Sequence, residues 1–415
     1  MAFAIGSGSH AQGYAVEIGG TLFQSPIAAY RNGTSWNVAP GYEEMPAPDF
    51  NRPITAECLL CHAGGVAATG REAISCDRCH GDASAHLRQP KRHTIVNPTR
   101  LPRAERDSVC EQCHLNGEAR VTNPGKAFGA FQPGQKLEET FSVFVFEQAR
   151  PGLKVVSHVE QLELSKCQQV TGKLWCGACH QPHGEPISVS TECRRCHSAL
   201  PAKHLAAAAS TVVCESCHMP KRPARDGSHS PFTDHRIQRR AAGQVTEANQ
   251  LAIRAWRPAA DPGVAKRNLG LAYVMAGERE GAAVLLNRGY QLLAEAFPSF
   301  PKDADVLASL GMVLFLKDQH ADAGKLLRAA IAARPTDSSL REKLAVILKA
   351  SGDAAGARVA LEKAIALDPS RETAYHLLAE LEQDPAKRRA ALERYLRFNP
   401  KSLIAREALA KLPAP

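Results

Sequence analysis

The chain has few aromatic residues and no long apolar segment. Aromatic side chains make up 6% of its 415 residues. No run of about 18 apolar residues occurs, so the sequence predicts no transmembrane helix. Cysteine is absent after Cys217, although thirteen cysteines precede that point or occupy it. The chain therefore divides into a cysteine-rich part and a cysteine-free part, and its length suffices for two or three domains.

Twelve of the thirteen cysteines belong to six copies of one pattern, Cys-x-x-Cys-His. The motifs are Cys58/Cys61/His62, Cys76/Cys79/His80, Cys110/Cys113/His114, Cys176/Cys179/His180, Cys193/Cys196/His197 and Cys214/Cys217/His218. Two thiols on one helical turn reach the two vinyl groups of a porphyrin, and the adjacent histidine lies under the iron. Zinc knuckles and redox dithiols also use Cys-x-x-Cys, but they do not need a histidine after every pair. We therefore expect six covalently bound haem c groups.

The net charge of +9 does not indicate a nucleic-acid partner once these cofactors are counted. Six haems carry twelve propionates, and twelve negative charges against +9 leave −3 with ferrous irons. Ferric irons add one charge each, which gives about +3. We interpret the basic side chains as the counter-charge of the propionates, and we expect no binding to nucleic acid.

The second axial ligands are expected to be histidines. The first half offers eight outside the motifs for six irons, namely His10, His86, His93, His158, His183, His204, His229 and His235. Six of these are the stronger candidates by context: His86, His158, His183, His204 and His235, and after them His10. A histidine close behind one motif cannot readily reach the same iron, so we expect it to serve a neighbouring haem. Met45 and Met219 are weaker options, and a methionine ligand would raise the potential of its haem.

The first 263 residues are expected to form three segments. Residues 1–57 read as short strands and turns, with a hairpin over Tyr14–Phe23 that turns at Gly19-Gly20. Residues 58–240 form the six-haem domain, in which Phe141–Phe146 is the clearest strand and 219–240 a basic loop. That loop faces either solvent and propionates or an acidic redox partner. Residues 241–263 are predicted to be a helical linker, with a helix over about Val245–Trp256 that ends before Pro258.

A repeat of 34 residues runs through 264–415. Pro301, Pro335 and Pro369 are spaced 34 residues apart. At the same spacing, two further positions of the repeat hold small residues and one holds a large residue. The small positions are Gly311, Ala345 and Ala379, and Ala323, Ala357 and Ala391; the large position holds Leu327, Leu361 and Tyr395. Small residues let two helices cross closely, and proline ends the second helix of each pair. The pattern resembles the tetratricopeptide repeat and implies an α-solenoid that contacts other proteins.

Other stretches of the chain carry a wider resemblance. They are Gly6-Ser7-Gly8 with Gly13-Tyr14, Phe50–Ile54, Ile95–Pro98, Cys110–His114, Phe141–Val143, Val156–Glu160, Cys217–Pro220 and Thr233–Arg236. With the repeats, they resemble bacterial multihaem c-type cytochromes that end in tetratricopeptide repeats. Those proteins are similar to the superfamily of hydroxylamine oxidoreductase. The resemblance implies a mainly α fold: a loop-rich multihaem cytochrome c domain with short N-terminal β elements, followed by an α-solenoid of repeats.

Covalent haem attachment implies a periplasmic or extracellular protein. The first ten residues have neither a basic segment nor an apolar run of about 7–15 residues, so we expect that an export signal precedes Met1 or has been removed. The family resembled usually has a signal peptide, and often a further haem motif upstream. The thirteenth cysteine, Cys167, is expected to be a buried structural thiol.

The favoured function is electron transfer through closely spaced, mostly bis-histidine haems, with redox partner proteins docked on the repeats and no catalytic residues. A second hypothesis is an oxidoreductase that acts on a small nitrogen or sulfur species at one haem with an open axial position, with a pocket shaped by the gap from His114 to Cys176. A third is a haem-lined filament or other homo-oligomer.

Overall fold

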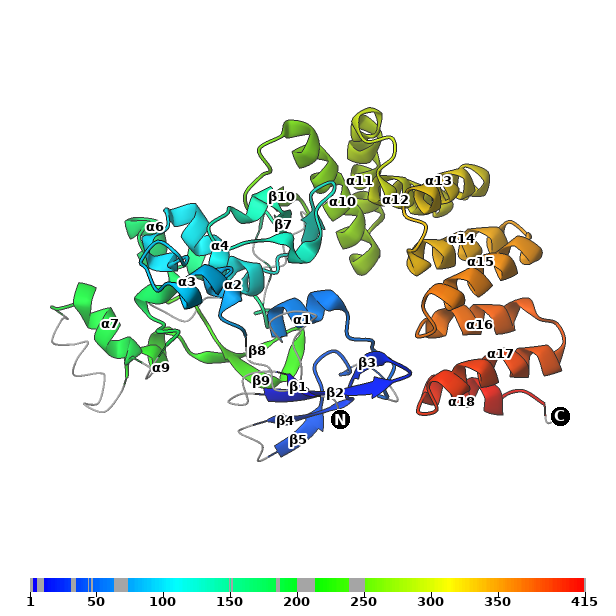
Figure 1. Ribbon diagram of the computed structural model, residues 1–415, viewed down its shortest axis with the longest axis horizontal. Coiled ribbons are helices and arrows are strands. Elements are labelled where there is room, and N and C mark those ends of the chain that lie inside the picture. Colours follow the sequence, from blue (N-terminus) through cyan, green and yellow to red (C-terminus); the bar gives the residue numbers. More distant parts are fainter. Residues whose placement is uncertain are drawn as a thin grey trace.

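The computed structural model describes residues 3–5, 11–30, 35–43, 45, 48–62, 74–148, 150, 152–183, 187–199, 213–238 and 251–413. The chain is mainly helical, and Figure 1 shows the repeat helices as an arch beside the motif-bearing half. Among the described residues, no helix combines the length and the apolar character needed to span a bilayer.

An antiparallel sheet opens the chain. Its strands are β1 (Phe3–Ile5), β2 (Ala11–Ile18), β3 (Thr21–Gln24), β4 (Ile27–Tyr30) and β5 (Ser35–Val38). Strands β2 and β3 pair with Ile18 opposite Thr21, so Gly19 and Gly20 form a two-residue turn. Both glycines have positive φ, 57° and 81°, as the tight turn of a hairpin requires. The predicted hairpin is confirmed.

All six motifs lie on short helices or helical turns. They are α1 (Ala56–His62), α2 (Asp77–His80), α4 (Arg103–His114), η4 (Cys176–Ala178), α7 (Val189–Cys196) and α9 (Cys214–His218). The helices α3 (Ser84–Arg88), α5 (His158–Glu163) and α6 (Lys166–Thr171) lie between them, with short 3-10 turns at Pro98–Arg100, Phe128–Ala130 and Leu137–Glu139. Helical geometry brings residues three apart onto one face, so the two thiols of a motif point the same way.

A three-stranded sheet stands between the motifs and the repeats. The predicted strand over Phe141–Phe146 is present as β7, and it pairs with β6 (Ala119–Thr122) on one side and β10 (Ile253–Ala255) on the other. The predicted helix over Val245–Trp256 is therefore wrong at its described end, because Ile253 pairs with Phe146 in the sheet. In β10, the buried Ile253 is followed by the exposed Arg254, as on a strand with one face in the core. The helical-linker prediction for 241–263 fails here for that reason.

The predicted basic loop at 219–240 is also corrected where it is described. Strands β8 (Lys221–Ala224) and β9 (Gly227–Thr233) form an antiparallel hairpin there. Two of its basic side chains are already paired, because Arg222 and Arg236 both form ion pairs with the buried Asp234. The hairpin therefore offers less free positive charge to an acidic partner than the composition indicates.

The repeats form an α-solenoid of paired helices, as predicted. The helices are α10 (Pro262–Glu280), α11 (Ala283–Ala296), α12 (Ala304–Phe315), α13 (His320–Ala333), α14 (Ser338–Ala350), α15 (Ala354–Leu367), α16 (Glu372–Leu381), α17 (Pro385–Phe398) and α18 (Leu403–Ala410), with a 3-10 turn at Phe297–Ser299. The repeated positions perform the expected packing. Ala323 and Ala357 are fully buried where helices cross, and Leu327, Leu361 and Tyr395 fill the core.

The solenoid contacts the first half of the chain at both of its ends (Figure 1). At its start, α10 packs on β6, β7 and β10, and the buried Arg267 donates to the carbonyl oxygen of Thr122 at 2.6 Å. At its end, Phe398 lies against Phe23 of the N-terminal sheet, with ring centres 6.4 Å apart. The motif-bearing half and the solenoid are therefore connected through packing as well as through the chain.

Candidate functional site

The motif helices contact one another directly. Cys61 Sγ of the first motif lies 3.8 Å from the carbonyl oxygen of Gln112, inside the third motif. The same Gln112 donates from its side chain to the carbonyl oxygen of Arg78, inside the second, at 2.7 Å. At the other end, the backbone N–H of Cys214 donates to Ser190 Oγ at 2.7 Å, which joins the sixth motif to the helix of the fifth. The motifs thus form contiguous groups, although long stretches of chain separate some of them.

All thirteen cysteines are free thiols in the structure, and none of them is fully buried. Exposed thiols on helical turns suit covalent attachment of a group that lies over the helix. The prediction that Cys167 is buried is wrong, because its side chain in α6 is only half-buried. Helix α6 lies at the surface, where Val170 is 82% exposed.

Three motif histidines each lie against a histidine that the sequence proposes as an axial ligand. The rings of His80 and His183 have centres 5.8 Å apart. Those of His114 and His158 are 5.2 Å apart, and those of His180 and His235 are 6.1 Å apart. In every pair the two residues come from different elements. As expected, His183 meets a motif other than the one it follows.

Hydrogen bonds fix the ring orientation of several of these histidines. Nδ1 of His80 lies 2.7 Å from the carbonyl oxygen of Val96, and Nδ1 of His218 lies 2.9 Å from that of Gln238. His235 Nδ1 lies 2.9 Å from the carbonyl oxygen of Thr233. A carbonyl oxygen only accepts, so Nδ1 must donate and Nε2 carries the lone pair of the neutral ring. This is the arrangement that histidine ligands of metals adopt.

Burial keeps the central histidines neutral. It lowers the pKa of His158 to about 3, and it also lowers the pKa of His114 and of His235. A protonated imidazole has no lone pair to offer, so depressed pKa values favour the ligating form. His158 Nδ1 is buried and has no hydrogen-bond partner among the described residues.

The remaining predicted ligands are not brought into such pairs. His10 and His204 lie outside the described residues, and so does the side chain of His229. His86 is described, and its Nδ1 lies 3.0 Å from Thr94 Oγ1. Over the described ranges, no second imidazole lies against His62 or His197. The described residues likewise contain no cluster of three or more side chains that could hold a bare metal ion.

A small cavity lies beside the first and third motifs. It holds space for about one water molecule, about 10 Å³, and Cys61, Cys113 and three phenylalanines (Phe128, Phe131 and Phe141) line it together with Leu60, Arg78, Gln112 and Gly129. The phenylalanines come from the long gap between the third and fourth motifs, which the sequence marked as a place for a pocket. Its volume is far below the roughly 300 Å³ at which small-molecule pockets begin.

Two groups near the motifs could not be anticipated from the sequence. Arg257, in the stretch predicted as linker, forms ion pairs with the buried Glu111 of the third motif and, at 3.0 Å, with Glu138. Gln161 links α5 to His235, since its side-chain oxygen accepts from the backbone N–H of His235 at 2.7 Å. Neither residue belongs to a recognisable motif. Only the pairing of segments far apart in the chain gives them a role.

Comparison with known proteins gives limited likeness. No family model matches the chain, and no curated protein matches it. Among solved structures, a mutant O-GlcNAc transferase of Thermobaculum terrenum is 22% identical, with a TM-score of 0.30, over 33% of this chain and 27% of that one. A crystal structure of MamA is 20% identical, with a TM-score of 0.29, over 36% of this chain and 98% of that one. The Cut9–Hcn1 hetero-tetramer of APC/C is 17% identical, with a TM-score of 0.30, over 34% of this chain and 29% of that one.

The chain thus spans less than a third of the length of the transferase and of the APC/C chain. At TM-scores this low, the likeness adds nothing to the solenoid that the helices themselves establish.

Proposed function

We propose that the chain is an electron-transfer multihaem c-type cytochrome with six covalently bound haem c groups, most of them bis-histidine. The observation that carries the proposal is the set of three histidine pairs, each made of one motif histidine and one predicted axial ligand. The two histidines of the His80–His183, His114–His158 and His180–His235 pairs are far apart in the sequence, so the pairs form only through tertiary packing. A common ligand held between the two rings of each pair accounts for all three.

The geometry of the pairs fits an iron between them. Metal–imidazole bonds are about 2 Å long, so two rings that bind one metal from opposite sides have centres roughly 6 Å apart. The ring centres of His80 and His183 are 5.8 Å apart, and those of His180 and His235 are 6.1 Å apart. His114 and His158, at 5.2 Å, are slightly closer. Donation from Nδ1 of His80 and His235 to backbone carbonyls leaves Nε2 as the ligating atom.

The protein around the pairs suits a relay of electrons. Haem iron, when bound, supplies the one-electron chemistry. The protein's task is then to hold neighbouring sites in contact and to keep the axial histidines neutral. Direct contacts join the first, second and third motifs through Gln112, and the fifth and sixth through Ser190. Burial favours neutral rings at His114, His158 and His235.

The other three irons would take their second ligands from the remaining candidates. We assign His10, His86 and His204 to this role beside His62, His197 and His218. The solenoid would dock a redox partner protein, because stacked helix pairs present an extended surface for such contacts. We also propose a periplasmic or extracellular location, because covalent haem attachment normally takes place outside the cytoplasmic membrane.

One experiment tests the number and ligation of the irons. Protein produced with a haem-attachment system would be examined by intact mass, by electron paramagnetic resonance when oxidised, and by carbon monoxide binding when reduced. Six added haems, low-spin irons throughout and no carbon monoxide uptake are the expected results. A mass without added haem would overturn the whole proposal.

One observation favours the alternative function, an oxidoreductase acting on a small nitrogen or sulfur species. The small cavity lies next to the first and third motifs, and no second imidazole lies against His62 among the described residues. An open axial position there would give a high-spin signal and uptake of about one carbon monoxide per protein. That outcome would favour the enzyme over the carrier.

A further inference from the structure

We infer that Gln161 is a positioning residue that fixes two axial histidines, His158 and His235, in front of their irons. The inference rests on the proposed function. His158 is the first residue of α5, and Gln161 lies three residues later, on the same face of the helix. Gln161 is 5% exposed, so its amide is withdrawn from solvent and must find its hydrogen-bond partners inside the protein.

Both ends of the Gln161 amide have such partners. The side-chain oxygen accepts from the backbone N–H of His235 at 2.7 Å, and the side-chain nitrogen donates to Ser157 Oγ at 2.7 Å. Because a backbone N–H only donates, the oxygen of the amide must face His235. Ser157 in turn donates to the carbonyl oxygen of Lys154 at 2.8 Å. The amide therefore fixes the backbone of His235 against the helix that carries His158.

The other side of His235 is held by separate contacts. Its Nδ1 lies 2.9 Å from the carbonyl oxygen of Thr233. The preceding Asp234, 1% exposed, accepts from the backbone N–H of Arg236 at 3.0 Å and forms an ion pair with the guanidinium of the same residue. These contacts shape the turn after β9 but do not connect it to α5. The hydrogen bond from His235 to Gln161 makes that connection, beside the direct ring contact between His235 and His158.

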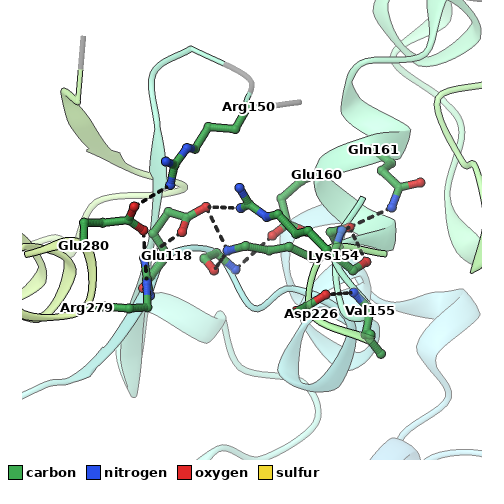
Figure 2. A network of polar contacts seen from close by, with 12 residues as sticks. Glu118, Arg150, Lys154, Val155, Glu160, Gln161, Asp226, Arg279 and Glu280 are labelled. Carbon is green, nitrogen blue, oxygen red and sulfur yellow. Dashed lines mark hydrogen bonds and ion pairs between the residues drawn. The ribbon is translucent and has the colours of Figure 1, made fainter. Parts of the chain in front are cut away.

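The helix α5 is itself braced by the network in Figure 2. Glu160 accepts from the backbone N–H of Gly117 at 2.9 Å, and Lys154 reaches Glu118 Oε1 at 2.8 Å. Glu118, whose side chain is 10% exposed, also pairs with Arg279 of α10 at 2.7 Å. The end of α10 is thus joined to the segment that carries His158. A buried network of this kind holds a ligand in one orientation, which a single hydrogen bond cannot do.

Two consequences distinguish this role from a merely structural one. The rings of His158 and His235 have centres 4.8 Å apart, and they lie against His114 and His180 respectively. Loss of the Gln161 amide would therefore alter the ligation of the fourth-motif iron first, because His235 loses its contact with α5. The third-motif iron would change less, since His158 stays within the helix.

The test compares three full-length variants loaded with haem. Q161L removes both hydrogen bonds at nearly constant volume, and Q161E keeps the oxygen that accepts from His235. Q168L is the matched control: Gln168 is a buried glutamine of the adjacent helix α6, and its side-chain oxygen has no partner among the described residues. A further variant, H235G, identifies the signal of the iron that His235 binds.

In Q161L, we expect the low-spin signal that H235G removes to shift or disappear, with uptake of about one carbon monoxide per protein. Q161E should restore that signal, and Q168L should leave all signals unchanged. Should Q161L not fold, S157A weakens the same amide more mildly and should shift the same signal. Unchanged spectra in both Q161L and S157A, with haem content preserved, would overturn the inference. Absence of haem from the wild-type protein would instead overturn the proposed function.

Discussion

Asp49 accepts a hydrogen bond from the backbone N–H of Leu403 at 2.5 Å, a residue 354 positions further along the chain. This contact caps the start of the last helix, α18, with a side chain from the N-terminal part of the chain. The side chain of Asn399 adds a hydrogen bond to the carbonyl oxygen of Phe50 at 3.0 Å, and Phe398 packs on Phe23. With α10 packed on the middle sheet, the chain forms a closed ring of contacts.

Replacement of Asp49 should loosen this ring where α18 meets the N-terminal part of the chain. Asp49 is 3% exposed, so D49A leaves the N–H of Leu403 without its buried acceptor, at a cost of about 1–2 kcal/mol. Hydrogen exchange should rise in α18 and in the N-terminal sheet together. The control is D384A, which removes the cap of α17 but touches no N-terminal residue. Equal effects of both variants on the sheet would contradict closure through Asp49.

Exchange of His183 for methionine should raise one reduction potential. If His183 and His80 share an iron, H183M gives it a histidine–methionine pair, which has a higher potential than a bis-histidine pair. A redox titration would show one of six centres moved upward. H93M serves as the control, because His93 is exposed and makes no ring contact with another described histidine. A titration curve that does not change in H183M would contradict the proposed pairing.

The buried Arg267 should matter far more than the exposed lysine beside it. Arg267 is 1% exposed and pairs with Asp303 at 2.9 Å, while it also donates to the first half at Thr122. R267M leaves a carboxylate without its partner, which costs roughly 3–5 kcal/mol. K266M breaks only the exposed pair with Glu295 and should cost about 0–1 kcal/mol. Urea denaturation followed by circular dichroism would measure both changes.

Two glycine-to-alanine changes in the solenoid should have opposite signs. A Cβ on Gly289 would lie 2.7 Å from Val274 Cγ2 and 2.9 Å from its backbone nitrogen, so α10 and α11 must move apart. We expect G289A to destabilise the protein by about 1–3 kcal/mol. A Cβ on Gly324 would meet the flexible end of Arg328 at 3.1 Å and would be in ordinary contact with Ile347 at 4.0 Å, so G324A should be neutral or stabilise by up to about 1 kcal/mol. Thermal denaturation of the two variants compares them directly.

The last repeats should lose stability at alkaline pH. Burial raises the pKa of Tyr395, which is 1% exposed, above its ordinary value of about 10. Above that pH the unfolded chain releases a proton that the native state retains, so stability present at lower pH is lost as the pH rises. Y395F should flatten this dependence above about pH 10 in urea titrations.

Local patterns were sufficient to predict much of the fold. The 34-residue period predicted the helix pairs because each repeated residue has one packing role, such as Leu327 in the core. The glycine pair at Gly19 and Gly20 predicted its hairpin for an equally local reason. Strand β10 was missed because its partner, β7, lies about a hundred residues earlier, and three residues are too short for alternation to stand out.

The candidate site was predictable only in part. The Cys-x-x-Cys-His pattern identifies the attachment cysteines and the first axial histidines directly. Because the first half has only eight other histidines, few residues are candidates for the second axial ligands. Which histidine meets which motif depends on how distant segments pack, as with His183 against His80. The contacts of Gln161 and Arg257 had no sequence signal, because an ordinary polar residue gains a role only from its partners.

Strand β10 has a consequence for how the protein can be divided. It belongs to the sheet of the first half through its pairing with β7, yet α10 begins only a few residues after it. Arg267 of the first repeat helix likewise completes hydrogen bonding in β6. A repeat domain cut at the start of α10 and transplanted elsewhere would uncover the face of the sheet on which α10 packs, and it would carry a buried guanidinium into solvent. The two halves are interlocked parts rather than interchangeable modules, and they would have to be inherited or engineered together.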